Sequence, residues 1–319
     1  MLCIQSHNLK ASFNLAMEEY LLKEFKEDIF FVYRNEDAVI VGKHQNAHAE
    51  SNALFLHEQH IPLYRRISGG GTVFHDKGNL NYGFISHTKA PAQVSFNRFS
   101  NLIIGFLKSI GIDANKNQRN SIETQGLKIS GTAEHIFKNT VLHHGTLLFS
   151  SNLDLLSKSL ASHPERYQHK AVPSVRSKVG NLSDYLPNIS VEAFSELFMK
   201  FVLHTSSDNL SYLLKTKDIN NIEIISKERY QQRKWNYGYS PPYTFQDRWE
   251  YEGKTQQIDL GVKDGFIENI HLKLSFLPEE ITYNIENAII EHPHSIESFK
   301  AVLHRLSSNH IKQIIQHSF

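Results

Sequence analysis

Two adjacent arginines followed by three glycines form the segment with the clearest chemical potential. Residues 65–76 read RRISGGGTVFHD, so Arg65 and Arg66 come shortly before Gly69, Gly70 and Gly71. Glycines let a backbone approach a ligand and point successive N–H groups toward it, and arginine can pair with phosphate or carboxylate. The segment lacks the spacing of a Walker loop and of a dinucleotide fingerprint. It predicts either a phosphate-binding loop of another kind or a plain glycine-rich loop with surface arginines.

A lysine on a predicted strand is the second feature. Residues 126–133 read GLKISGTA, and in an extended strand Lys128, Ser130 and Thr132 share one face. An ammonium group fixed there could stabilise the charge that develops on a reacting carboxylate or phosphate. The alternative is an edge-strand lysine that merely discourages aggregation.

Two pairs of histidines also stand out. Residues 143–148 read HHGTLL, and neighbouring strand residues point to opposite faces, so His143 and His144 cannot both line one site. His57 and His60 are three residues apart, whereas the zincin pattern needs four. We interpret this second pair as a solvated helix end.

The elements expected to position these residues follow an α+β pattern rather than a regular alternation of strand and helix. Residues 13–22 have apolar side chains at helical spacing, with Ser12 as a possible cap. The apolar runs 29–34 and 38–41, separated by three turn-forming residues, predict a hairpin that ends at Gly42. Further helices are expected at 50–60, 96–110 and 191–204, and further strands at 62–65, 80–85, 127–135 and 141–149.

A domain boundary is expected at residues 237–242, YGYSPP, because paired prolines stop regular structure. This divides the chain into residues 1–242 and a smaller α+β domain at 246–319. In the smaller domain, two strands at 257–262 and 266–274 are joined across Lys263-Asp264-Gly265, which is a hairpin signal. Helical patterns follow at 285–291 and 295–306.

The composition excludes several classes of protein. Among 319 residues, 34 Lys and Arg balance 33 Asp and Glu, so the formal net charge of +1 offers no general hold on nucleic acid. The single cysteine, Cys3, excludes an internal disulfide and a multi-cysteine zinc site. The chain has no apolar run of about 18 residues that would predict a membrane span. We expect a soluble, cytoplasmic protein with no nucleic-acid or membrane partner.

Several segments, in this order, resemble the lipoate-protein ligase A family of the biotin/lipoate ligase superfamily. The resemblance covers nearly the whole chain, and its specificity comes from the number of matching segments rather than from any one. They are residues 13–19 (FNLAMEE), 42–46 (GKHQN), 65–79 (RRISGGGTVFHDKGN), 128–133 (KISGTA), 143–148 (HHGTLL), 172–177 (VPSVRS) and 235–238 (WNYG).

The resemblance implies an α/β (α+β) fold: a mixed-sheet catalytic domain related to biotin ligases, with a small accessory domain that moves between the two steps. It implies a two-step reaction, in which ATP and lipoate give lipoyl-AMP and pyrophosphate, and a carrier lysine then takes the lipoyl group. Mg²⁺ is the implied metal. The implied partners are lipoyl domains of 2-oxoacid dehydrogenase complexes and the glycine cleavage carrier protein.

Carried over by position, the resemblance also implies roles for individual residues. Lys128 would touch both the lipoyl carbonyl and the α-phosphate. A fixed ammonium group there could stabilise the charge that develops in both transition states. The implied nucleotide contacts are Arg66, Gly71, Thr72, Val73 and Phe74. The implied walls of the lipoate pocket are Arg65, Gly69, Gly70 and His144.

One departure from the family pattern concerns the metal. The family usually has Arg-Asn-Asp before the lysine strand, whereas this chain has Arg119-Asn120-Ser121. Glu123 would share a face with Ser121 in an extended segment and could reach Mg²⁺ instead. The alternative is that phosphates and water hold the ion.

Other activities compete with ligation. An acyltransferase that works through a thioester needs a thiol in the pocket, and Cys3 is far in sequence from every site motif. A lipoyltransferase that uses preformed lipoyl-AMP, with activation lost, is compatible with Ser121. A lipoate-binding protein without catalysis would have no need of Lys128, and the glycine loop differs from the pattern expected of biotin ligases.

Overall fold

The computed structural model of the protein describes residues 1–88, 96–118 and 120–319. Its largest sheet has the strand order β10-β11-β6-β2-β1-β13. These strands are β1 (Leu2–Gln5), β2 (Ile29–Tyr33), β6 (Asn79–His87), β10 (Thr132–Phe137), β11 (Thr140–Leu148) and β13 (Leu210–Ser211). β1 runs parallel to β2 and β13, whereas the other pairs are antiparallel. The expected α+β class with a mixed sheet is therefore confirmed.

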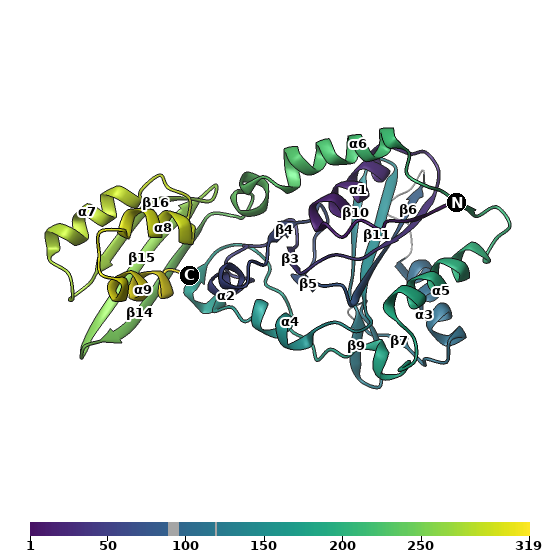
Figure 1. Ribbon diagram of the computed structural model, residues 1–319, viewed down its shortest axis with the longest axis horizontal. Helices are drawn as coiled ribbons and strands as arrows, with labels where there is room; N and C mark the ends of the chain where they lie inside the picture. Colours follow the sequence, from purple (N-terminus) through teal and green to yellow (C-terminus); the bar gives the residue numbers. More distant parts are fainter. Residues whose placement is uncertain (89–95, 119) are drawn as a thin grey trace.

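Helices cover both faces of this sheet (Figure 1). Alternate residues of β2 point into different cores, so Phe30 and Val32 pack on one side and Phe31 and Tyr33 on the other. The first core lies under α3 (Phe96–Ser109) and α5 (Val191–Leu203). The second lies under α1 (Ala11–Glu24) and α6 (Thr216–Ile225). Helix α1 begins one residue before Ser12, with Lys10 at its N-cap, so Ser12 does not cap it.

The predicted hairpin between residues 29 and 41 is wrong. β3 (Ala38–Val41) belongs to a separate sheet, where it pairs in parallel with β4 (Leu63–Arg65) and antiparallel with β5 (Val73–His75). β2 and β3 are buried along their whole length, and each has sheet partners on both edges. Asn35, between them, is held by Asn14 and by His75, so the turn redirects the chain from one sheet to the other.

The predicted strand at 127–135 is two strands. β9 (Leu127–Ser130) pairs with β8 (Ile122–Thr124), which also pairs with β7 (Asn115–Lys116). After Gly131 the chain changes partner, and β10 pairs with β11. This break places Lys128 at the end of a small sheet, beside the large one.

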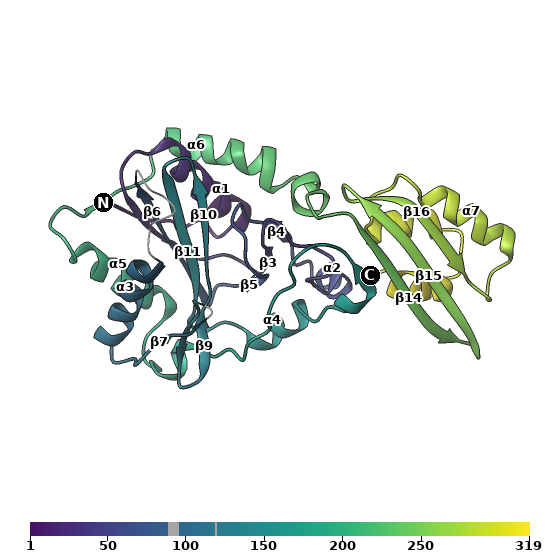
Figure 2. The same ribbon diagram turned by 180° about the vertical axis from the view of Figure 1, so that it is seen from behind.

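The C-terminal region forms a sheet of its own with the order β12-β14-β15-β16. Its strands are β12 (Tyr167–Gln168), β14 (Tyr243–Tyr251), β15 (Lys254–Lys263) and β16 (Phe266–Lys273). The predicted hairpin at Lys263–Phe266 is confirmed, with Asp264 and Gly265 at positive φ. Helices α7 (Glu279–Ile289), α8 (Ile296–Leu303) and α9 (Ser308–Gln316) cover one face, as Figures 1 and 2 show. Because β12 comes from residues 167–168, the sheet is not made from the tail alone.

The remaining helical segments connect these layers. They are α2 (Ala53–Glu58), α4 (Leu153–Ser159) and the short turns η2 (Pro164–Arg166), η3 (Leu182–Asp184), η4 (Ser226–Tyr230) and η5 (Lys234–Gly238). Among the residues that the structure describes, no helix has the length and apolar character needed to cross a bilayer.

Candidate active site

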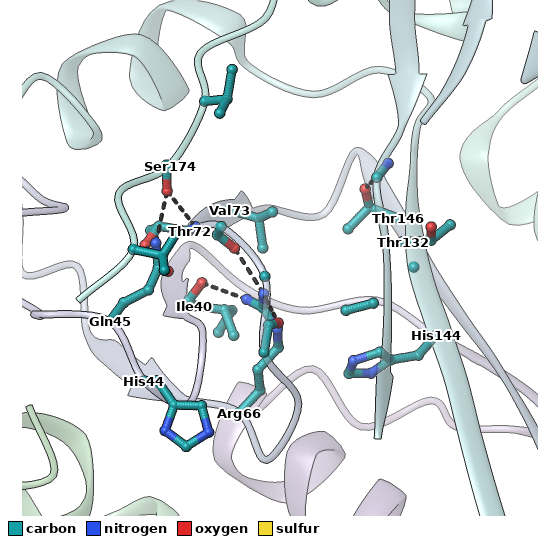
Figure 3. Close-up of a pocket in the computed structure, with 18 of the residues that line it drawn as sticks. Ile40, His44, Gln45, Arg66, Thr72, Val73, Thr132, His144, Thr146 and Ser174 are labelled. Atoms are coloured by element: carbon teal, nitrogen blue, oxygen red, sulfur yellow. Dashed lines mark hydrogen bonds between the residues drawn. The ribbon is translucent and has the colours of Figure 1, made fainter. Parts of the chain in front are cut away.

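Two adjoining cavities lie between the large sheet and the small β3 sheet. Their volumes are about 660 and 320 Å³. Lys128 lines both of them, and so do parts of the glycine loop and of residues 173–177. Figure 3 shows Gln45, Thr72 and Ser174 gathered on one side, with His144 and Thr146 on the strand across from them. The structure therefore brings the three chemical features of the sequence to one place.

Arg66 shapes the glycine loop from inside. Its guanidinium is buried and donates hydrogen bonds to the carbonyl oxygens of Gly69 (2.6 Å) and Gly71 (2.8 Å). It also donates to Ser68 Oγ and to the carbonyl of Ile40. Burial lowers the pKa of Arg66 to about 10, with Glu18 opposing the shift, so the group stays charged at neutral pH. A buried cation thus holds the loop, with its charge beside the first cavity.

His144 belongs to a chain of hydrogen bonds that ends at Arg66. His144 Nε2 lies 2.6 Å from Ser68 Oγ, and His144 Nδ1 lies 2.8 Å from Glu18 Oε2. Ser68 Oγ accepts from Arg66 Nε, so the Ser68 hydroxyl donates its own proton to His144 Nε2. His144 then carries its proton on Nδ1 and donates it to Glu18. Although this order resembles a Ser-His-Glu triad, Ser68 is fully buried and does not line either cavity. The chain positions Arg66 rather than supplying a nucleophile.

The two neighbouring histidines separate as the strand alternation predicts. His144 lines the first cavity. His143 points to the opposite side of β11, where it stacks on Phe99 and bonds Glu134.

Lys128 stands at the junction of the two cavities. Burial lowers the pKa of its ammonium group, and the charge of Glu123 acts in the opposite direction. A Cβ on Gly131 would lie 3.4 Å from Lys128 Cε and Nζ, so glycine at this position leaves room for the lysine side chain. A partly desolvated ammonium group in this place can stabilise negative charge in either cavity.

Glu123, the candidate metal ligand, lies outside both cavities. The pairing register shifts between Ile122 and Glu123, and Glu123 lies opposite Lys128. Ser121 lines the first cavity, whereas the Glu123 carboxylate accepts a hydrogen bond from Asn117 and lines neither cavity. Arg119 lies outside the described residues. Within the described ranges, no group of three His, Cys, Asp or Glu is arranged to hold a metal ion.

Arg65 also departs from its expected place in the pocket wall. It is fully buried and lines neither cavity. Its guanidinium donates to the carbonyl groups of Gly42, Lys43, Gln45, Trp235 and Asn236 and to Ser240 Oγ. Arg65 therefore connects β4 with the chain that leads to the C-terminal sheet.

The other predicted residues lie at the cavities. Gly69, Gly70 and Gly71 line the first, Thr72 and Val73 line both, and Phe74 lines the second. Three residues that the motif analysis did not single out, Gln45, Glu50 and Ser174, join the walls of the site through hydrogen bonds. Gln45 and Ser174 fall inside the segments 42–46 and 172–177, which was the available signal, whereas nothing in the sequence pointed to Glu50.

Comparison with known proteins agrees with this geometry. Residues 10–202 match the model of the lipoyl protein ligase A/B catalytic domain. The chain is 36% identical to lipoate-protein ligase 1 of Staphylococcus aureus, over 91% of this chain and 89% of that protein. The structure of a lipoate-protein ligase A bound with ATP is similar with a TM-score of 0.64 at 25% identity, covering 75% of this chain and 98% of that one.

A bipartite lipoate protein ligase from Thermoplasma acidophilum, studied with its E2 lipoyl domain, shares the fold. Its TM-score is 0.63 at 23% identity, and the match covers 75% of this chain and 96% of that one. By the family match and the relative's identity and coverage, this chain belongs to the lipoyl protein ligase A/B family. It is an enzyme of the ligase class.

Proposed function

We propose that this chain is an ATP-dependent lipoate-protein ligase. In the first step a lipoate carboxylate oxygen attacks the α-phosphorus of ATP, and pyrophosphate leaves. In the second step a carrier lysine amine attacks the acyl carbonyl of lipoyl-AMP, an amide forms, the amine loses a proton and AMP leaves. Activation is needed because a free carboxylate is a poor electrophile.

The observation that carries this proposal is the position of Lys128 between two cavities of different character. The first cavity has apolar walls from Leu15, Ile40 and Val73, which suit an acyl chain. The second has apolar walls from Leu148, Leu153 and Leu156, which suit a nucleobase. A carboxylate and an α-phosphate held in the two cavities would meet beside the Lys128 ammonium group.

The proposed roles follow from this arrangement. Lys128 stabilises the charge that develops at phosphorus and at the acyl oxygen in both steps. Thr72, Val73 and Phe74, which line the second cavity, contact the nucleotide, and Gly71 contacts it from the side of the first cavity. Arg66 keeps the glycine loop in shape and contributes positive charge. Gly69, Gly70 and His144 form the wall of the acyl pocket.

Few side chains at this site could act as ligands of Mg²⁺. The described residues that line the first cavity include no Asp or Glu, and the second cavity has Glu50, whose carboxylate is bonded to Ser174. The donor set does not fit a protein-built magnesium site. We propose that any Mg²⁺ enters with the nucleotide and keeps phosphate and water ligands.

The proposed acceptors are lipoyl domains of 2-oxoacid dehydrogenase complexes and the glycine cleavage carrier protein. The E2 lipoyl domain described with the Thermoplasma ligase supports the first class. We also propose that residues 1–242 form the catalytic unit and 246–319 an accessory domain. A hydrophobic core built mostly from residues 243–319, to which Ala49 and Tyr167 also contribute, supports this division.

The test measures lipoate-dependent exchange of pyrophosphate into ATP, and then the mass of an added apo lipoyl domain. We expect exchange and a lipoyl mass gain, and Lys128→Ala should reduce exchange by about 10²–10³-fold. Exposed Lys178, whose backbone carbonyl accepts from the Lys128 N–H, provides the control, because Lys178→Ala should retain exchange. Transfer from synthetic lipoyl-AMP without any exchange would identify a lipoyltransferase instead. Lipoate binding without either reaction would contradict both activities.

A further inference from the structure

The carboxylate of Glu50 is buried beside the site, and the proposed reaction assigns it no role. Glu50 is 8% exposed, and its carboxylate is not part of any salt bridge in the described chain. Its two oxygens instead accept from one residue, Ser174: Oε1 from the backbone N–H at 3.0 Å and Oε2 from the hydroxyl. Burying a carboxylate is costly unless its hydrogen bonds are satisfied. The position of Ser174 therefore explains why Glu50 is tolerated there.

Ser174 lies in the wall segment, residues 170–177, which lines both cavities. Within the described chain, this segment has no helix or strand. Val172 and Val175 are largely exposed, at 78% and 63%, so apolar packing holds the segment weakly. A wall without secondary structure or buried apolar side chains depends on its polar anchors.

The Ser174 hydroxyl uses its full hydrogen-bonding capacity. Its oxygen accepts from Thr72 N–H at 2.8 Å and from Gln45 Nε2 at 3.0 Å, and its one proton goes to Glu50. Gln45 Oε1 in turn accepts from Gly42 N–H and Thr72 Oγ1. Figure 3 shows Ser174, Gln45 and Thr72 joined in this way. One hydroxyl thus connects the wall segment to the glycine loop, and Glu50 orients that hydroxyl.

We infer that Glu50 is a positioning residue that holds the wall segment closed over the acyl-adenylate by orienting Ser174. This inference rests on the proposed ligase function. An acyl-adenylate reacts with water as well as with an amine, so a site that makes one before the carrier arrives must exclude water. The wall segment lines both halves of the site, and its loosening would admit water to the reactive carbonyl.

Glu50→Gln is the sharpest test, because it preserves size and removes one acceptor. Two donors face the carboxylate, so it must accept at both oxygens, whereas a glutamine amide accepts at one end and donates at the other. Either orientation leaves one bond mismatched. Glu58→Gln is the matched control, since Glu58 is exposed at the end of α2.

The first readout is the ratio of AMP released to carrier lipoylated. We expect a ratio near one for the intact enzyme and Glu58→Gln, and a rise of about 3- to 10-fold for Glu50→Gln, the range that one lost hydrogen bond allows. Ser174→Ala should raise the ratio similarly. The double variant should add little to either single change, because both act on the same bond. Full additivity, or an unchanged ratio in folded Glu50→Gln, would overturn the inference.

The second readout does not depend on ligase activity. Amide hydrogen exchange in residues 170–177 should be faster in Glu50→Gln than in Glu58→Gln, while exchange in the core strands stays the same. Unchanged exchange in the wall segment would reject Glu50 as its anchor. If amide hydrogen exchange in the wall segment rises but the intact enzyme makes no lipoyl-AMP, the role of Glu50 as an anchor is supported and the ligase proposal fails. The two failures are therefore distinguishable.

Discussion

At the scale of single residues, burial and a neighbouring carboxylate have opposite effects on the pKa of Lys128. Burial lowers the pKa of Lys128, and Glu123, its partner across the β8–β9 pair, raises it. In the proposed mechanism the ammonium form stabilises the transition states, so activity should fall as the pH rises through this lowered pKa. We therefore propose that Glu123 acts on the lysine across the hairpin and not on a metal.

This assignment predicts the behaviour of Glu123→Gln. Removing the carboxylate lowers the pKa of Lys128 further, so the alkaline limb of the pyrophosphate exchange rate should move to lower pH. The dependence on Mg²⁺ should stay as it is in the intact enzyme. Measuring exchange against pH and against Mg²⁺ tests both statements, with Glu58→Gln as the control. A loss of Mg²⁺ dependence would instead return Glu123 to the role of metal ligand.

At the scale of elements, the site depends on close approach between two loops. The chain after β3 passes the glycine loop so closely that a Cβ on Gly42 would lie 2.1 Å from the carbonyl oxygen of Gly70. The bond from Lys43 N–H to Ser68 O (2.8 Å) holds the same two loops together. Gly42 is therefore required by its surroundings, although its own backbone is ordinary.

Gly42→Ala should consequently damage both folding and activity. The added methyl group forces the loops apart, and overpacking of this kind costs about 1–3 kcal/mol. We expect a lower midpoint in urea and a reduced rate of pyrophosphate exchange. Gly105→Ala is the matched control: its Cβ meets nothing closer than 3.8 Å, and alanine is the better helix former. Equal effects of the two substitutions would show that the loops can separate without consequence.

At the scale of the whole molecule, buried polar residues connect the catalytic region to the C-terminal sheet. The Arg65 guanidinium donates to carbonyl groups of the 42–45 turn and of η5, and Ser240 Oγ accepts a further bond. His48 Nε2 contacts the carbonyl of His294, which also accepts from Arg233. The strand pair β12–β14 adds a backbone link. The connection near Pro241 and Pro242 is therefore supported by contacts from the catalytic region.

This network predicts that Arg65 matters for stability rather than for substrate binding. Arg65→Met removes every hydrogen-bond donor of the guanidinium and leaves buried carbonyl groups unpaired. The free energy of unfolding should therefore fall by about 3–5 kcal/mol. The KM for lipoate of the folded fraction should change little. Denaturant titration and initial rates measure the two quantities. A raised lipoate KM with unchanged stability would place Arg65 in the pocket wall after all.

Local patterns in the sequence determined much of the architecture and the position of the chemistry. Period-two alternation separated His143 from His144, turn residues marked the hairpin at 263–265, and the glycine-arginine segment marked a loop that does line the site. These signals depend on a few adjacent residues, whose geometry is the same in any fold. The family resemblance was sufficient for the class of enzyme.

Only the tertiary structure decided which segments meet. β2 and β3 look alike in sequence yet join different sheets, and Ser121 lines the first cavity whereas Glu123 lines neither. The partners Glu18 and His144 are 126 residues apart, and Glu50 and Ser174 are 124 apart. Arg65 and Arg66 are adjacent, but Arg65 forms hydrogen bonds to η5 whereas Arg66 shapes the glycine loop. Hydrogen-bond partners of buried polar groups depend on packing across the whole chain, and no local pattern encodes them.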